Sequence, residues 1–238
     1  MAQNAERSTG DAASAPKKVL CLSASARPDG NARQMAEALL EGVAQAGHEG
    51  ELVHLADHVT RLFGNCRECR NAEGFCTLDD GYENILLNKY VKADAVVYVS
   101  PIYWYGISGH LKNFLDRFYC YMSGGYPHKD AFIQGMMGKK AALLLSAEEN
   151  SFSKRTPIVQ HMIQLCEYME HEFVGIAVTT ANSRKDVRSD PNKPLDSARE
   201  LGRLLFDIHE TDYRLDTDRG PIIWQGDDSA YKHPAYWR

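Results

Sequence analysis

Small hydroxyl-bearing and turn-forming residues are concentrated between residues 23 and 32, where they could bind a phosphate group. The segment reads Ser-Ala-Ser-Ala-Arg-Pro-Asp-Gly-Asn-Ala. It joins an apolar run of strand length to a stretch with helical periodicity, so the start of a helix and its free N–H groups should lie here. The hydroxyls of Ser23 and Ser25 and the charge of Arg27 would also favour an anion. The alternative is an ordinary turn with Asn31 as N-cap, and neither G-x-G-x-x-G nor a Walker A motif is present.

Three consecutive aromatic residues, Tyr103, Trp104 and Tyr105, form the second candidate site. They follow another apolar run and stand between Pro101 and Gly106, which shape the backbone of a loop. Three neighbouring rings cannot all point into the core, so at least one should line a cleft and contact a flat ligand. The alternative is that they only cover the end of a sheet. A ligand with a phosphate at one end and a flat ring at the other would fit both loops.

Three cysteines, Cys66, Cys69 and Cys76, are clustered with the spacing C-x2-C-x6-C. Six cysteines in 238 residues do not form a secreted disulfide framework, so the cluster needs another explanation. Thiolates could bind zinc with a fourth ligand or hold an iron–sulfur cluster. We predict a reduced loop without metal and keep a metal site at these three cysteines as the alternative. Cys21 and Cys166 are expected to pack in the core.

The elements that must position these loops alternate regularly along the chain. Five short apolar runs of strand length are each followed by a stretch with helical periodicity. The runs are 19–22, 52–55, 95–99, 141–145 and 173–178, and the expected helices include 80–90, 111–118, 158–169 and 195–209. Strands that are apolar on both faces favour a parallel sheet with helices on both sides. The sequence therefore predicts a doubly wound five-stranded α/β domain, which binds ligands at the carboxyl ends of its strands.

Composition narrows the possible partners. The net charge is −5, without the basic excess that nucleic-acid binding requires, and no apolar run is long enough to cross a membrane. We expect a cytoplasmic protein with a disordered tail over 1–16, one domain over 17–211 and an aromatic extension over 212–238. That extension should pack on its own domain or on another subunit of a homodimer or homotetramer. The segment 123–138 is expected to be a loop that covers the ligand, and the alternative is a surface excursion without such a role.

The segment from Ser100 to Arg117, together with residues 23–32, resembles the flavodoxin-like NAD(P)H-dependent FMN reductase family. The resemblance extends over about residues 17–210 and implies a flavodoxin-like fold with bound FMN. It implies that the phosphate is bound by Ser23, Ser25, Arg27, Asn31 and Ala32. The flavin ring would contact Pro101, Ile102, Tyr103, Trp104, Tyr105 and Gly106, and then Ser146, Ala147 and Glu148, where family members often carry more glycine.

The resemblance also implies the reaction. NADH or NADPH would give a hydride to FMN, and electrons would pass to a quinone, an azo or nitro compound, free flavin or a metal ion, with no catalytic side chain required. The alternative is an FMN-binding electron-transfer protein related to the iron-sulfur flavoproteins, which use four cysteines in the segment that holds Cys66. This chain departs from that pattern, because Ala72 stands where a third cysteine would follow Cys69.

Overall fold

A parallel sheet forms the centre of the protein in a computed structural model that describes residues 15–65, 68–184 and 186–209. Its strands lie in the order β2-β1-β3-β5-β6. The strand order therefore reverses at β1, which has β2 on one side and β3 on the other. A short sixth strand, β4, pairs antiparallel with the end of β3. The strands are β1 (Lys18–Ser23), β2 (Glu49–His54), β3 (Ala95–Tyr103), β4 (Gly106–Ile107), β5 (Lys140–Ala147) and β6 (Glu172–Thr180). The predicted five-stranded parallel sheet is confirmed, and β4 is an addition to it.

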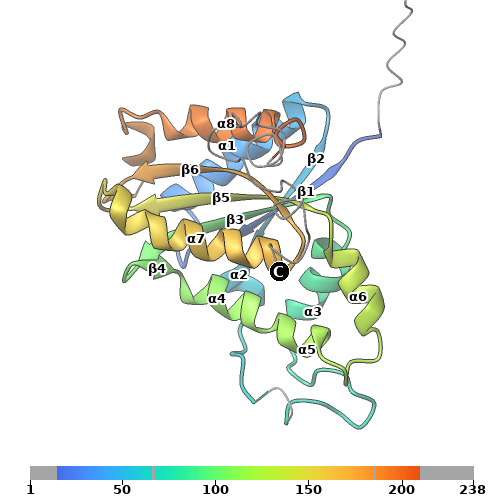
Figure 1. The fold of residues 1–238 in the computed structure, drawn as a ribbon. Coiled ribbons are helices and arrows are strands. Elements are labelled where there is room, and N and C mark those ends of the chain that lie inside the picture. The colour runs from blue at the N-terminus through green and yellow to red at the C-terminus, as the bar shows by residue number, and fades with distance from the viewer. Residues whose placement is uncertain (1–14, 66–67, 185, 210–238) are drawn as a thin grey trace, which may run out of the picture.

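Helices cover both faces of this sheet (Figure 1). Helices α1 (Asn31–Gln45) and α8 (Pro194–Arg203) lie on one face. The other face carries α2 (Leu55–His58), α3 (Tyr82–Ile85), the π-helical turn Leu86–Tyr90, α4 (Gly109–Asp116), α5 (Phe118–Met122), α6 (Lys129–Met136) and α7 (Phe152–Tyr168). A 3-10 turn, Asp186–Arg188, precedes α8.

The alternation of side chains along β1 produces two hydrophobic cores. Val19 and Cys21 pack on the side of α1 and α8, whereas Leu20 and Leu22 pack on the opposite side. Since consecutive strand residues point to opposite faces, a strand buried on both sides must be apolar throughout. Cys21 and Cys166 are buried in these cores, as predicted.

Several boundaries differ from the predictions. Strand β3 continues to Tyr103 because its last residues pair with β4 after the parallel sheet ends. The predicted helix 111–118 is divided at Arg117 into α4 and α5, and α8 ends at Arg203, six residues early. The segment 123–138 is not simply a loop, since α6 buries Phe132 and Met136 in the core. A covering loop is therefore not what this segment provides.

The predicted domain boundaries fall mostly where the structure gives no description. Residues 1–14 and 210–238 lie outside the described residues, so the tail and the aromatic extension stay predictions. None of the helices in the described part of the chain is long and apolar enough to cross a membrane.

His171 links the fold to pH. It is 5% exposed, and its Nε2 donates a hydrogen bond to the carbonyl of Met136 at 2.7 Å. Burial lowers the pKa of His171 from 6.5 to about 4, because the charged form would lose its hydration. The unfolded chain therefore binds a proton more readily, and stability should fall as the pH drops from 6.5 to about 4, then level off.

We expect this histidine to account for a loss of about 3 kcal/mol in the free energy of unfolding over that interval. His171→Gln keeps a donor for the carbonyl of Met136. Between pH 6.5 and pH 4, this variant should lose about 3 kcal/mol less free energy of unfolding than the wild type. Urea unfolding of both proteins at pH 7 and pH 4 measures the difference. Equal losses in the two proteins would contradict the assignment.

Candidate functional site

The loops that follow β1 and β3 are bonded to each other at the carboxyl edge of the sheet. The N–H of Ala24 donates to the carbonyl of Val99 at 2.8 Å, and Ser108 Oγ donates to the carbonyl of Ala24 at 2.7 Å. Ser108 also caps α4 by accepting the N–H of Leu111 at 3.3 Å. A serine just before a helix is an ordinary capping signal, but its contact with Ala24 spans 84 residues and was not predicted. The two predicted ligand loops therefore form one surface.

The start of α1 has the features that the sequence predicts for a phosphate site. Its N-cap is Gly30, and no N-cap side chain bonds the first N–H groups of the helix. These N–H groups are therefore available to a ligand. Ser25 Oγ accepts the N–H of Arg27 at 3.0 Å, which fixes the loop, and the Arg27 side chain is exposed. The buried Ser23 Oγ has no partner among the described residues. Free helix N–H groups, an unpartnered hydroxyl and a nearby arginine fit a phosphate monoester.

Asn31 and Ala32, which were predicted to bind the phosphate, have structural contacts at the start of α1. The side-chain amide of Asn31 donates to the carbonyl of Ser183 at 2.8 Å, and its Oδ1 accepts the N–H of Val187 at 3.3 Å. Ala32 is buried in the core beneath α1. The loop after β6 thus holds the start of the helix in place, a contact that was not predicted. Whether either residue also contacts a phosphate stays a prediction.

The aromatic residues form a tight turn between β3 and β4. Tyr103 pairs with Gly106, and the two residues between them, Trp104 and Tyr105, have φ values of 49° and 61°. Two positive φ angles define a turn that favours Asn and Gly, so each bulky residue costs about 1 kcal/mol or more here. Trp104 is 97% exposed. An exposed, strained pair of rings indicates a selected function for this turn.

The turn forms one wall of a pocket of about 240 Å³. The end of β5, the segment that follows it and the first turn of α7 also line the pocket. The lining residues are Ile102, Trp104, Tyr105, Ala147, Glu148, Glu149, Lys154 and Arg155. Lys154 forms an ion pair with Glu149, and its Nζ lies 5.2 Å from the centre of the Tyr105 ring. The structure thus brings together the predicted aromatic loop and the predicted loop 146–149.

Lys154 and Arg155 were missed in the sequence analysis. They lie in the first turn of α7, where basic side chains have no favourable interaction with the helix dipole. Two basic residues at the start of a helix are unfavourable for stability, and this pattern could have identified them as candidate functional residues from the sequence. The other predicted ring contacts, Pro101, Tyr103, Gly106 and Ser146, do not line this pocket. Pro101 is buried in β3 and pairs in register with Ser146 of β5, whereas Tyr103 is exposed.

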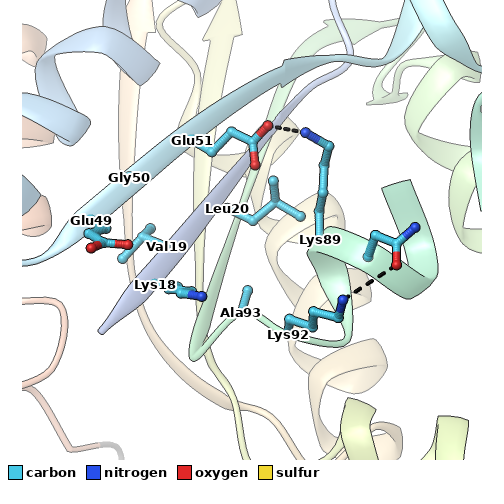
Figure 2. A pocket seen from close by; sticks show the side chains of 10 residues that line it. Lys18, Val19, Leu20, Glu49, Gly50, Glu51, Lys89, Lys92 and Ala93 are labelled. Carbon is cyan, nitrogen blue, oxygen red and sulfur yellow. Dashed lines mark hydrogen bonds and ion pairs between the residues drawn. The ribbon is translucent and has the colours of Figure 1, made fainter. Parts of the chain in front are cut away.

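A second hollow is separate from this site (Figure 2). Its lining includes Lys18 and Glu49, the first residues of β1 and β2, so it lies at the amino ends of the strands. Figure 2 shows Lys89 facing Glu51, with which it forms an ion pair. Because the hollow lies at the opposite sheet edge from the predicted ligand loops, we do not include it in the candidate site.

The cysteines that lie together in the structure are not the three that are clustered in the sequence. Cys69 and Cys76 lie beside Cys120, a residue of α5 to which no role was assigned from the sequence. Cys66 lies outside the described residues. The structure therefore groups three thiols that the sequence spacing alone does not.

The strained turn gives a test of function against stability. Replacing Trp104 and Tyr105 by Asn and Gly should raise the free energy of unfolding by about 2 kcal/mol, because Asn and Gly accept positive φ at little cost. The same change should weaken FMN binding by removing the rings. Glu170→Gly is the control, since Glu170 has a φ of 54° at the end of α7, away from the turn. It should stabilise the protein and leave FMN binding unchanged. Thermal unfolding and fluorescence titration with FMN measure both effects, and unaltered FMN affinity in the turn variant would contradict the predicted role.

Comparison with known proteins identifies the family. A family model described as NADPH-dependent FMN reductase matches residues 17–180. An iron-sulfur flavoprotein of Archaeoglobus fulgidus is 31% identical over 199 residues, which cover 84% of this chain and 83% of that protein. An iron-sulfur flavoprotein of Methanocaldococcus jannaschii is 36% identical over 100 residues, 42% of this chain, and the match spans about half (51%) of that protein.

A solved structure shows the same fold. The NAD(P)H:quinone oxidoreductase of Methanothermobacter marburgensis aligns with a TM-score of 0.59 at 22% identity, over 82% of this chain and 99% of that one. The flavodoxin-like architecture predicted from the resemblance is thereby confirmed. The description of the matching family names FMN and NADPH. The match covers more than half of the sequence, and the chain belongs to the NADPH-dependent FMN reductase family.

Proposed function

We propose that the protein is an FMN-dependent NAD(P)H oxidoreductase that reduces a planar acceptor of the quinone class. The observation that carries the proposal is the pocket between the Trp104–Tyr105 turn and the segment after β5, on the sheet edge that also holds the start of α1. An anion site and an aromatic pocket on one edge match a ligand with a phosphate and a flat ring.

Each part of the site has a defined task in this proposal. Bound FMN supplies the redox chemistry, taking a hydride from the nicotinamide and passing electrons to the acceptor. The N–H groups at the start of α1, with Ser25 and Arg27, hold the phosphate. The carbonyl of Ala147 accepts the N–H of Ala181 at 2.8 Å, which fixes the segment whose backbone would face the ring.

Lys154 and Arg155 are the residues that favour a quinone-type acceptor. A quinone gains negative charge on its oxygens as it is reduced, and fixed positive charges near those oxygens stabilise that change. Both residues line the pocket, beside the exposed rings on which a planar acceptor can stack.

The first experiment is an absorption spectrum of the purified protein before and after addition of NADPH or NADH without oxygen. We expect a bound flavin whose absorption is lost rapidly with one of the two nucleotides. Turnover should then be measured with a benzoquinone, an azo dye and a protein acceptor. Slow bleaching by both nucleotides would favour the alternative, an electron-transfer protein such as the iron-sulfur flavoproteins among its relatives.

The second experiment tests the acceptor. Replacing Lys154 and Arg155 together by Gln should lower kcat/KM for the benzoquinone by about tenfold, because two charge contacts are lost in the reduced acceptor. The anaerobic rate of flavin reduction should not change. Lys112→Gln is the control, an exposed lysine paired with Asp116 on α4 and outside the pocket. Equal turnover in the wild type and the double variant would refute the quinone assignment.

The expectation of a homodimer or homotetramer belongs to this proposal. A pocket whose aromatic wall is this exposed would gain a second wall from another subunit. Light scattering of the full chain and of a chain lacking 212–238 tests the predicted oligomer. A monomeric full chain would contradict the prediction. The cytoplasmic location stays a prediction from the sequence.

A further inference from the structure

We infer that Cys69, Cys76 and Cys120 bind a single zinc ion that fastens the segment between α2 and α3 to helix α5. The ligating sulfur atoms of the three residues all lie within 4.8 Å of one another. Zinc bound to thiolates at about 2.3 Å in a tetrahedron holds its sulfurs about 4 Å apart, so this grouping suits one ion. This proposal does not depend on the acceptor or on the flavin.

The spacing of the sulfurs also separates this site from an iron–sulfur cubane. In a cubane each cysteine binds a different iron, so the terminal sulfurs diverge and lie farther apart than around one ion. This chain also has Ala72 at the position where a third closely spaced cysteine would stand. The third sulfur comes instead from α5, far along the chain. The ligand set is therefore different from a cluster motif within one loop.

The local backbone is built to hold two of the sulfurs. Cys76 forms an antiparallel bridge with Arg70, and the carbonyl of Cys69 accepts the N–H of Thr77 at 2.8 Å. A turn between them is closed by Asn71, whose Oδ1 accepts the N–H of Phe75 at 2.8 Å. Cys69 and Cys76 thus lie on the two arms of one small hairpin.

The hairpin is docked tightly on the segment that carries the third sulfur. Arg70 Nη2 donates to the carbonyl of Cys120 at 2.6 Å and also bonds Ser123. A Cβ atom on Gly74 would lie 2.2 Å from the carbonyl oxygen of Gly125, so only glycine allows this approach. The positive guanidinium beside the cluster would compensate the negative charge of three thiolates on a divalent ion.

The segment also needs such a fastening. Between α2 and α3 the described residues form only an isolated bridge and irregular backbone, in a connection much longer than most in compact domains. In a connection of this kind a structural zinc supplies folding free energy directly. Cys120 is 3% exposed, so the ion would be held against the core, with a fourth position left for water or another ligand.

Metal analysis of the full chain, purified without oxygen and without added metal, tests the proposal. We expect about one zinc per chain and neither iron nor acid-labile sulfide. Cys120→Ala should lower bound zinc more than about tenfold, because one of three protein ligands is lost. Cys166→Ala is the matched control, a buried cysteine of the same core outside the group, and it should keep its zinc.

A second measurement protects the test against misfolding of the variant. The wild-type protein, stripped with a chelator and titrated with cobalt, should show the intense absorption of a tetrahedral thiolate site. Stoichiometric iron with sulfide, the weak bands of octahedral cobalt, or zinc retained by a folded Cys120→Ala protein would each overturn the proposal.

Discussion

Arg117→Met should lower the free energy of unfolding by about 3 to 5 kcal/mol, because it leaves a buried carboxylate without its partner. Arg117 Nη1 and Nη2 donate to the two oxygens of Asp80 at 2.6 and 2.9 Å, and the side chains are only 3% and 2% exposed. Asp80 Oδ2 also accepts the N–H groups of Thr60 and Arg61. Although burial acts to raise it, these hydrogen bonds and Arg117 lower the pKa of Asp80 below its usual value, so it is charged at neutral pH.

The expected drop in melting temperature is about 10 °C for a domain of this size. Thermal and urea unfolding of the variant measure it. The matched control is the double variant Asp80→Asn with Arg117→Met, which removes both charges and should be more stable than Arg117→Met alone. A single variant that unfolds within about 1 kcal/mol of the wild type would show that Asp80 finds another partner or takes up a proton.

This ion pair shows which parts of the molecule a single sequence can reveal. Apolar runs such as 95–99 predict buried strands because their periodicity depends only on neighbours in the chain, and the five parallel strands followed from them. Asp80 and Arg117 each resemble an ordinary surface charge in sequence. Their pairing joins residues 37 apart and appears only when the segment before α3 is placed against α4.

The candidate site divides in the same way. The hydroxyl loop and the aromatic triplet were found because their composition is unusual over a few consecutive residues. Lys154 and Cys120 were missed because each contributes through space, one beside the Tyr105 ring and the other beside two distant cysteines. The positive φ of Trp104 and Tyr105 could not be foreseen either, since propensity argues against it and tertiary contacts must enforce it.

Gly42→Ala should lower the free energy of unfolding by about 2 to 3 kcal/mol and weaken FMN binding with it. A Cβ atom on Gly42 would lie 1.9 Å from the carbonyl oxygen of Arg199 on α8. The contact is reciprocal, because a Cβ on Gly202 of α8 would lie 2.0 Å from the carbonyl of Leu39. The backbones of α1 and α8 therefore touch, and neither can yield as a flexible side chain would.

The sign of this effect is what makes it informative. At a solvent-exposed position within a helix, alanine is more favourable than glycine by up to about 1 kcal/mol. A loss of stability in Gly42→Ala can therefore come only from the contact between α1 and α8. Gly109→Ala is the control, since Gly109 begins α4 and a Cβ there meets nothing within 4 Å. It should not lower stability. Because α1 carries the anion site at its start, a displaced helix should also release FMN, measured by titration at a temperature where Gly42→Ala is folded. A folded variant with wild-type stability and FMN affinity would mean that the separation of α1 from α8 does not position the phosphate site.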